Sequence, residues 1–241
     1  MCKVMGIVNV TPDSFSDGGQ FFKPEEAVRR AKNLIADGAD IIDLGGESTR
    51  PGATPISWEE EWSRIEPVLA DLASSVSRLK SFQISVDTYH PETAERAIKA
   101  GATIINCVYP EPIPEMLKLL EGNDVELVLP AKALFPLPSS LFPRLYLDPM
   151  IGFNTSREED VELLRSIPDL AKKGRVLVGA SRKRIVKKLV GEKSAVGKNI
   201  GGNVAIAIWA ALNGASVVRV HDVKETVQAL RVVDALGEGE R

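Results

Sequence analysis

Polar and charged side chains stand where several short apolar runs of this sequence end. A lone Asp or Asn in such a place is usually a helix cap or a turn residue. Several of them gathered on one face would supply carboxylates and amides that hydrogen-bond a polar heterocycle, beside cations that bind an anion. The positions are Asn9, Asp43, Asp87, Asn106, Asp148, Arg219 and His221.

A basic cluster, Ser181-Arg182-Lys183-Arg184, directly follows the apolar run 175–180. The alternative is the solvated start of a helix, but cations are stabilised at the C-terminus of a helix rather than at its beginning. The beginning of a helix favours a bound anion. We therefore expect this cluster to face an anionic ligand.

Two long segments, 9–23 and 45–56, are rich in Gly, Ser, Thr and Pro. Phe15, Phe21 and Phe22 lie in the first, and aromatic side chains are costly to expose unless they cover something. We expect both segments to be mobile loops that close over a substrate and exclude water, with plain surface loops as the alternative.

The elements that must position these residues follow an alternating pattern. Three amphipathic segments run through Gly-Ala, at 38–39, 101–102 and 214–215, into short β-branched runs. Glycine ends a helix in a left-handed conformation, and such apolar runs are typical of strands buried on both faces. Strands are predicted at 3–9, 40–45, 82–87, 103–107, 125–130, 144–148, 175–180 and 216–220. Helices are predicted at 24–36, 58–74, 91–100, 113–121, 157–172, 182–190, 199–213 and 223–236.

This alternation predicts an α/β fold, a (β/α)₈ TIM barrel, in which active sites form at the carboxyl ends of the strands. An open doubly wound sheet is the alternative. Prolines at 136, 138 and 143 interrupt the segment 131–143, so the helix between strands 5 and 6 is predicted to be missing. No composition shift or linker divides the chain, and we expect residues 1–241 to form a single domain.

Composition and charge exclude several classes of protein. Hydrophobic residues make up 44% and charged residues 26%, which is typical of a globular protein with a large core. The formal net charge of −3 gives no basic footprint, so no nucleic-acid partner is expected. The longest apolar run, Val204 to Leu212, is too short to span a bilayer, and the first residues lack the pattern of a secretory leader. Because only Cys2 and Cys107 are present, we expect free thiols and a cytoplasmic protein without a membrane partner.

Seven motifs occur in an order that resembles the dihydropteroate synthase family of folate biosynthesis. The match extends over nearly the whole chain, and the first two motifs are long and specific. They are MGIVNVTPDSFSDGG at 5–19, DLGGESTRPGA at 43–53, ISVDTYHPE at 84–92, GATIIN at 101–106, LDPMIGF at 147–153, SRK at 181–183 and RVHDVKET at 219–226. The resemblance implies a TIM barrel that joins 4-aminobenzoate to 6-hydroxymethyl-7,8-dihydropterin pyrophosphate and releases pyrophosphate with the help of Mg²⁺.

The resemblance also implies roles for residues in the matching motifs. The implied catalytic residues are Asp87, Lys183 and Arg219. The implied pterin-binding set is Asp87, Asn106, Asp148, Phe153 and Lys183. The implied pyrophosphate end consists of Asn9, which would also hold Mg²⁺, with Arg50, Arg219 and His221. The implied neighbours of aminobenzoate are Thr49, Pro51 and Arg182.

Several positions depart from the family pattern, and they cluster around the expected pterin pocket. They are Cys107, Pro130, Ala131, Met150, Asn154 and Thr155. These departures leave open a non-catalytic pterin-binding paralogue or one subunit of a heteromer. A pterin-dependent methyltransferase of the same barrel type is disfavoured, because the first two loop motifs match the synthase. A missing crossover helix would expose strand flanks, so we expect a homodimer in which the partner covers them.

Overall fold

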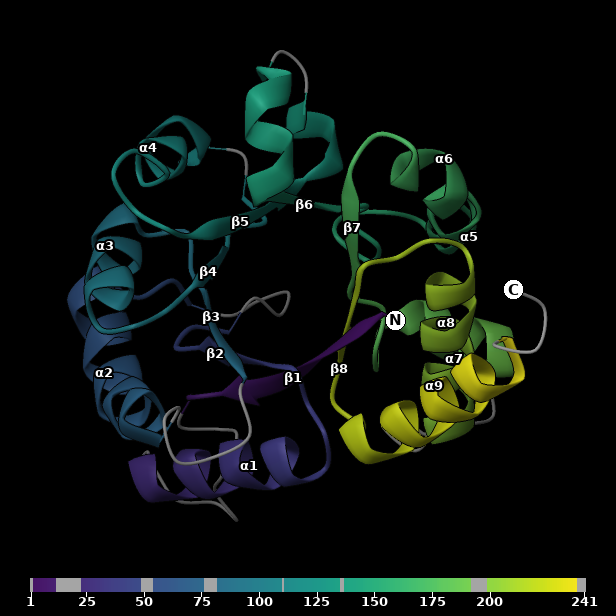
Figure 1. Cartoon of the computed structure of the whole chain (residues 1–241), viewed down its shortest axis with the longest axis horizontal. Coiled ribbons are helices and arrows are strands. Elements are labelled where there is room, and N and C mark those ends of the chain that lie inside the picture. The colour runs from purple at the N-terminus through teal and green to yellow at the C-terminus, as the bar shows by residue number, and fades with distance from the viewer. Residues whose placement is uncertain are drawn as a thin grey trace.

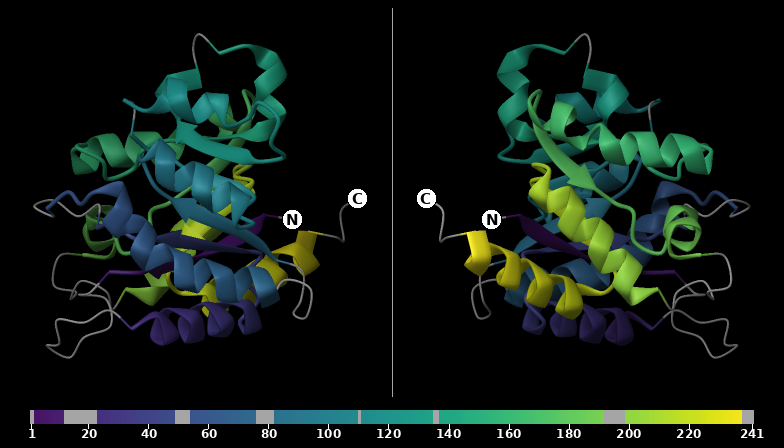
Figure 2. Two further views of the ribbon diagram at one scale, coloured as in Figure 1. Left: turned by 90° about the vertical axis from the view of Figure 1, so that its left-hand side faces the viewer. Right: turned by 90° about the vertical axis from the view of Figure 1, so that its right-hand side faces the viewer.

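A closed barrel of parallel strands forms the centre of the computed structural model, with the helices in a ring around it (Figures 1 and 2). The structure describes residues 2–11, 23–48, 54–75, 82–109, 111–134, 137–191 and 199–237. The strands pair in chain order, and β8 closes on β1. They are β1 (Lys3–Asn9), β2 (Ile41–Gly45), β3 (Gln83–Asp87), β4 (Ile104–Asn106), β5 (Glu126–Pro130), β6 (Leu145–Asp148), β7 (Arg175–Val178) and β8 (Val217–Val220). The predicted (β/α)₈ barrel is confirmed, and the open sheet is excluded.

The helices lie between successive strands, as the alternating pattern predicts. They are α1 (Pro24–Ala36), α2 (Trp58–Ser75), α3 (Pro91–Lys99), α4 (Ile113–Lys118), α5 (Arg157–Arg165), α6 (Ile167–Ala171), α7 (Arg184–Val190), α8 (Ile200–Leu212) and α9 (Val223–Gly237). The Gly-Ala junctions have the expected geometry: Gly38 and Gly101 follow α1 and α3 at φ +103° and +106°, where a residue with a Cβ would be strained.

Two layers of apolar side chains hold the barrel and its helices together. A larger cluster lies between the strands and the helices, and it includes Leu34 of α1, Leu69 of α2 and Leu230 of α9. A smaller cluster draws on strands alone, so it fills the inside of the barrel. Its members are Met5, Ile41, Ile104, Val128, Tyr146, Leu177 and Val217. The barrel is therefore a packed core, and a ligand must bind at one of its ends.

The amino-terminal end of the barrel is closed by a polar network. Lys3 Nζ donates to Gln83 Oε1 at 2.7 Å, and Glu126 forms an ion pair with Arg175, whose guanidinium lies 4.0 Å from the centroid of the Tyr146 ring. These residues come from the beginnings of β1, β3, β5, β6 and β7. These contacts fill the amino-terminal end with polar side chains that bond to one another, although Arg175 Nη2 has no hydrogen-bond partner among the described residues.

The segment between β5 and β6 confirms one prediction and corrects another. Its described residues form two short 3₁₀ helices, η2 (Ala131–Leu134) and η3 (Ser139–Arg144), in place of an α-helix. The flanks of the strands are nevertheless covered, because Leu137, Leu141 and Phe142 pack against the outer core. Arg144 ties the segment to the preceding one through the carbonyls of Leu120 and Val125, at 2.7 and 2.9 Å. The expectation that this crossover leaves strand flanks exposed was wrong.

The helix predicted over 157–172 is two helices, α5 and α6, which meet at Ser166. Pro168 lies in the first turn of α6, and its ring removes a backbone donor and excludes a continuous helix through this point. Ser156 caps α5 in a reciprocal capping box with Glu159. In the described part of the chain, none of the helices combines the length and the apolar character that crossing a bilayer requires.

Candidate active site

The carboxyl ends of the strands bring most of the predicted site residues to one mouth of the barrel. The pairing register places Asn9 opposite Gly45, Gly45 opposite Asp87, and Asp87 opposite Asn106. These ends of β1 to β4 are therefore level with one another. A Cβ on Gly45 would lie 3.9 Å from both Asn9 Oδ1 and Asp87 Oδ2, so those side chains flank it from opposite sides.

Arg219 of β8 connects the carboxylates of two other strands across the mouth. Its Nε donates to Asp43 Oδ2 and its Nη2 donates to Asp87 Oδ2, each at 2.6 Å. Asp43 is fully buried, and it also accepts from Ser85 Oγ at 2.6 Å and Asn106 Nδ2 at 3.3 Å. The sequence identified Asp43 as a polar residue near a strand end but assigned it no role. Its ion pair with Arg219 could not be predicted from the sequence, because the two residues are 176 positions apart.

Charges and burial at this mouth shift the pKa values of the paired groups. Burial raises the pKa of Asp87 to about 7, with Arg219 lowering it and Asp43 and Glu61 raising it. Burial alone would lower the pKa of Arg219, but Asp43 and Asp87 raise it above its ordinary value. Arg219 is therefore a permanent cation, whereas Asp87 changes charge near neutral pH.

A buried carboxyl group behind Asp87 was not singled out from the sequence. Glu61 of α2 is 0% exposed, and its Oε2 accepts from Thr88 Oγ1 at 2.6 Å. Burial raises its pKa. A Cβ on Gly46 would lie 2.9 Å from Glu61 Cγ and 3.0 Å from its backbone oxygen, so only glycine allows α2 to approach β2 this closely.

Asp148, at the end of β6, and Lys183, directly before α7, form a second group of polar residues whose charges interact. Asp148 Oδ1 accepts from the Met150 backbone N–H at 2.6 Å, and burial raises the pKa of this carboxyl group. Lys183 Nζ donates to the carbonyl of Ile151 at 2.6 Å and lies 4.2 Å from the centroid of the Phe153 ring. Burial lowers the pKa of Lys183 to about 8, although Asp148 opposes this shift. The predicted pterin residues Asp148, Phe153 and Lys183 are thus joined through the 150–153 turn.

Three residues without the freedom of glycine hold left-handed backbone conformations near this pair. They are Met150 at φ 67°, Asn154 at φ 53° and Arg182 at φ 60°. Such conformations cost roughly 1 to 3 kcal/mol each and persist where the surroundings enforce them. Thr155 and Asp160 enforce the turn, because both accept from the Gly152 N–H, at 3.1 and 2.6 Å. The family departures at 150, 154 and 155 therefore form one self-consistent turn.

We expect Met150→Gly to stabilise the protein by about 1 kcal/mol. Glycine relieves the left-handed strain, and the greater conformational entropy that it gives the unfolded chain offsets only part of this gain. Urea denaturation should show a higher midpoint with an unchanged slope. Met150→Ala is the matched control, since it removes the side chain and keeps the strain. A Met150→Gly variant no more stable than Met150→Ala would contradict this account.

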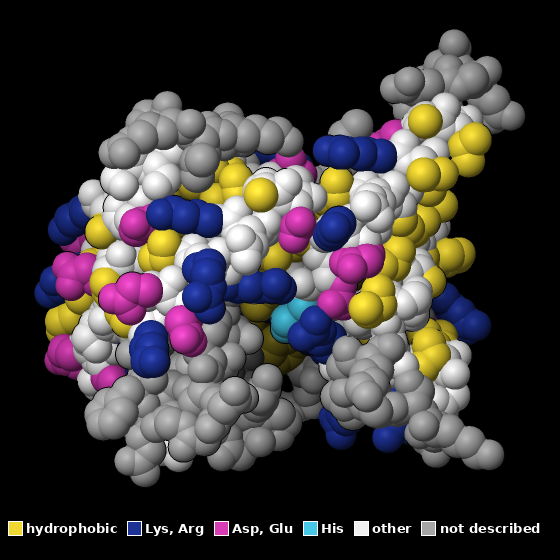
Figure 3. Space-filling view, turned by 90° about the horizontal axis from the view of Figure 1, so that it is seen from below, with side chains coloured by type: hydrophobic (Ala, Val, Ile, Leu, Met, Phe, Trp, Pro, Cys, Tyr) yellow, Lys and Arg dark blue, Asp and Glu magenta, His cyan; other side chains and the backbone are white. Residues whose placement is uncertain are grey.

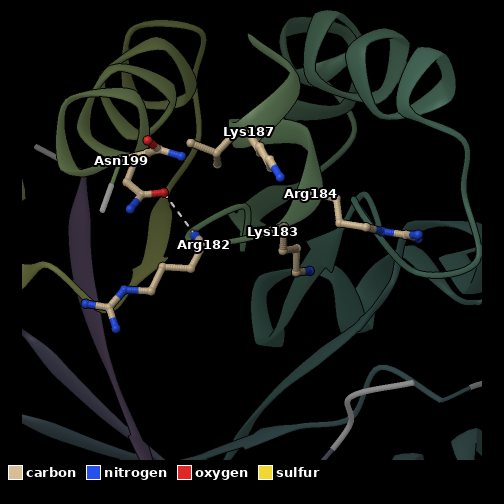
Figure 4. Close-up of a pocket in the computed structure, with 7 residues that line it drawn as sticks. Arg182, Lys183, Arg184, Lys187 and Asn199 are labelled. Atoms are coloured by element: carbon tan, nitrogen blue, oxygen red, sulfur yellow. Dashed lines mark hydrogen bonds between the residues drawn. The ribbon is translucent and has the colours of Figure 1, made fainter. Parts of the chain in front are cut away.

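The side chains of the basic cluster at 181–184 do not all point the same way (Figure 4). The side chains of Arg182 and Arg184 extend to opposite sides in this view. Arg182 Nη2 pairs with Asp222 Oδ1 at 2.6 Å, and its backbone N–H donates to Asn203 Oδ1 at 2.9 Å. Asn203 in turn donates to Asp222 Oδ2 at 2.9 Å. Sequence reasoning missed Asn203 and Asp222, which fix the strained backbone and the guanidinium of Arg182.

His221 follows β8 and lies beside Ser181. Ser181 Oγ lies 3.1 Å from His221 Nδ1 and accepts from the His221 backbone N–H at 3.2 Å. Burial, with Arg182 and Arg219 nearby, lowers the pKa of His221 to about 3, so the ring is neutral and can act only as a hydrogen-bonding group. Ser181 was part of the cluster in the sequence, but its contact with His221 depends on the pairing of β7 and β8.

Thr49, Arg50 and Pro51 lie outside the described residues, as do residues 12–22 of the first segment predicted to be a mobile loop and residues 49–53 of the second. The roles assigned to these residues therefore remain predictions from the sequence. The remaining predicted site residues are all at the carboxyl end of the barrel or in the turns that follow it.

Comparisons with known proteins bear on this mouth and on the whole chain. The family model described as "Pterin binding enzyme" matches residues 5–136 and 141–221. A dihydropteroate synthase from Staphylococcus haemolyticus is 36% identical over 99% of this chain and 96% of its own length. The chain belongs to the dihydropteroate synthase family.

Solved structures of family members agree with this assignment. The dihydropteroate synthase of Xanthomonas albilineans with 4-aminobenzoic acid has 38% sequence identity and a TM-score of 0.84, over 98% of this chain and 93% of the other. A structure of the same synthase with 7,8-dihydropteroate has 35% identity and a TM-score of 0.80, over 98% and 94%. The resemblance inferred from the motifs is confirmed, and these synthase relatives favour it over a methyltransferase.

Proposed function

We propose that this chain condenses 6-hydroxymethyl-7,8-dihydropterin pyrophosphate with 4-aminobenzoate to give 7,8-dihydropteroate and pyrophosphate. Membership of the dihydropteroate synthase family supports this transferase activity. The observation that carries it is the barrel mouth, where Asp87, Asn106 and Asp148 lie near the cations Arg219 and Lys183. Such a mouth suits a polar heterocycle attached to an anion.

The pterin ring fits the carboxylate and amide side of the mouth. The N–H groups on its pyrimidine edge would donate to Asp148, Asn106 and Asp87. Its oxygen would accept a hydrogen bond from Lys183. Phe153 supplies an apolar face, and its ring already lies beside the Lys183 ammonium. Burial of these groups makes each hydrogen bond stronger than it would be in water.

The reaction separates charge, and the mouth is polarised in the matching sense. Cleavage of the carbon–oxygen bond at the pterin methylene leaves positive charge on the pterin and negative charge on pyrophosphate. Asp87 and Asp148 stabilise the first, and Arg219 with His221 and Arg50 stabilises the second. Asp87, Lys183 and Arg219 are the proposed catalytic residues. The amine of 4-aminobenzoate is nucleophilic when neutral, and Thr49, Pro51 and Arg182 are proposed to hold that substrate.

Mg²⁺ fits this donor set as an ion held chiefly by pyrophosphate and water. Among the described residues, no three His, Cys, Asp or Glu side chains gather as metal ligands. Mg²⁺ keeps several waters and needs few protein oxygens, so the Asn9 amide oxygen at the end of β1 is a sufficient protein ligand. When bound, Mg²⁺ would neutralise part of the charge on pyrophosphate.

We expect kcat/KM to have a bell-shaped dependence on pH with a maximum between pH 7 and 8. The acidic limb follows Asp87, whose raised pKa of about 7 means that it loses its accepting, ionised form below neutrality. The alkaline limb follows Lys183, whose lowered pKa of about 8 means that it loses its donating proton above that pH. In Lys183→Arg the alkaline limb should vanish while the acidic limb remains. A profile flat across this range would contradict both assignments.

The proposed activity is tested by measuring pyrophosphate release from the dihydropterin pyrophosphate with Mg²⁺, with and without 4-aminobenzoate. Release that depends on 4-aminobenzoate, with formation of 7,8-dihydropteroate, is expected. No release from a folded sample that still binds the pterin would favour the non-catalytic paralogue or the heteromer subunit.

A homodimer is part of the proposal, and its interface is proposed at α8 and α9 rather than at the β5–β6 crossover. Large apolar side chains gather along the side of the molecule where these helices lie (Figure 3). Trp209 and Leu212 of α8 are 49% and 66% exposed, and Val232 and Leu236 of α9 are 59% and 77% exposed. Such a patch marks an association surface. Sedimentation velocity should show a dimer that Leu212→Asp dissociates.

The cellular setting is proposed to be the cytoplasm, with 1–241 acting as a single domain and with no nucleic-acid or membrane partner. Cys2 and Cys107 are both free thiols, as a reducing compartment keeps them. Burial raises the pKa of each to about 12, so both are unreactive.

A further inference from the structure

Among the described residues of the mouth, Asp43 bonds to the largest number of other side chains, and the proposed mechanism does not use it. Its carboxylate, in β2, is fully buried, and it accepts from three side chains on three other strands. These are Ser85 of β3 at Oδ1, and Asn106 of β4 and Arg219 of β8 at Oδ2. Burying a carboxylate destabilises a fold unless its partners compensate for the lost solvation. We therefore asked which neighbouring groups depend on the carboxylate of Asp43.

The first consequence of Asp43 concerns the amide of Asn106. A carboxylate oxygen only accepts hydrogen bonds, so the Asn106 group that faces it must be the NH₂. The amide oxygen, Oδ1, therefore points away from Asp43. That oxygen is buried and has no hydrogen-bond partner among the described residues. A buried acceptor without a partner is destabilising, so it awaits a donor from a ligand.

The second consequence concerns the guanidinium of Arg219. Asp43 holds Nε from inside the barrel, while Asp87 holds Nη2 at the level of the mouth. Two anions that each accept from a different nitrogen of a planar group restrict both its position and its rotation. Arg219 is thereby held before any substrate enters, and its cation need not be reorganised when negative charge develops on a leaving group.

We propose that Asp43 is a positioning residue that sets the hydrogen-bond polarity of Asn106 and the orientation of Arg219. The inference rests on the proposed function and deepens it. Asn106 acts as an acceptor for an N–H of the pterin because Asp43 occupies its donor. Arg219 faces the pyrophosphate because Asp43 holds its Nε. Asp43 touches neither substrate.

Two variants separate these tasks. Asp43→Asn keeps an acceptor for Asn106 and Arg219, because its NH₂ can donate to the Ser85 hydroxyl, but it removes the charge. Affinity for the pterin alcohol, 6-hydroxymethyl-7,8-dihydropterin, should change by less than about threefold, whereas kcat/KM for its pyrophosphate ester should fall about thirtyfold as the ion pair weakens. Asp43→Ala removes the acceptor as well, and affinity for the alcohol should fall about tenfold.

Ser85→Ala is the matched control. It also deprives Asp43 of a hydrogen bond, and so lowers the melting temperature, but it leaves the contacts to Asn106 and Arg219 in place. Its affinity for the alcohol and its kcat/KM for the ester should stay within about threefold of the wild type. A purely structural role for Asp43 predicts instead that both ligands lose affinity together, in step with the melting temperature, in all three variants.

The experiment is calorimetry with the alcohol and steady-state kinetics with the ester, on the full chain. A split between the two ligands in Asp43→Asn supports the inference, and equal losses for both ligands overturn it. In an Asn106→Ala background, Asp43→Ala should cost no further affinity for the alcohol, and a full tenfold additional loss would overturn the role assigned through Asn106. If Asp43→Ala does not fold, the comparison of alcohol affinity with kcat/KM for the ester in Asp43→Asn still tests the inference. A wild-type chain that binds no pterin at all would refute the proposed function instead.

Discussion

Arg219→Ala should reduce kcat/KM for the dihydropterin pyrophosphate by about 10³, because it removes the cation that we propose stabilises the leaving group. The same change leaves Asp43, which is fully buried, without its ionic partner. Breaking a buried pair in this way costs about 3 to 5 kcal/mol of folding free energy. Steady-state kinetics and urea denaturation measure the two effects separately.

The loss should depend on the phosphates of the ligand. Affinity for the pterin alcohol should fall much less than affinity for the pyrophosphate ester, and equal losses would contradict the assignment. Arg175→Ala is the control, because Arg175 is also an ion-paired arginine on a neighbouring strand, at the closed end of the barrel. It should lower stability and leave the ratio of the two affinities unchanged.

Asp87→Asn should weaken pterin binding by about 10- to 100-fold, because a charge-assisted hydrogen bond from a pterin N–H becomes a contact with a neutral amide. Arg219 also loses its anionic partner at the level of the mouth, although the amide oxygen can still accept its hydrogen bond. Calorimetry with the pterin alcohol measures the first effect directly. Near-normal affinity would refute Asp87 as a pterin ligand.

The pH dependence gives Asp87→Asn a second readout. Because the pKa of Asp87 is raised to about 7, the wild-type affinity should fall as the pH drops below neutrality, and the variant should lose this dependence. Asp40→Asn is the control. Asp40 accepts from the Val4 N–H at 2.9 Å, next to the beginning of β2, so the same substitution there should affect stability alone.

The architecture was predictable because it depends on short-range patterns. Apolar runs of strand length, alternating with amphipathic segments, gave all the strands to within two residues of their observed ends. The prolines between β5 and β6 predicted the loss of an α-helix correctly, because proline acts on its own turn. The prediction of a single helix over 157–172 was wrong, because Pro168 interrupts it in the same way.

The site was predictable only where strand ends mark it. Asn9, Asp87, Asn106 and Asp148 end their strands, so the geometry of a parallel barrel gathers them at one mouth. Glu61 and Asn203 lie within helices, on faces that look like any other part of an amphipathic pattern. Nothing local marks them, because their partners Thr88 and Asp222 come from other elements.

Local sequence patterns were enough to predict the order of strands and helices, the end of the barrel that carries polar groups, and the family. Tertiary structure decided the contacts: Arg219 with Asp43 and Asp87, Lys183 with the 150–153 turn, and His221 with Ser181. Closure of the barrel decided the contacts of Arg219, because pairing β8 with β1 brings this residue within 3 Å of carboxylates more than a hundred positions away. Pairing of β7 with β8 decided the contact of His221 with Ser181. Hydrogen-bond polarity, burial and pKa shifts depend on these distances, and only the closed barrel sets them.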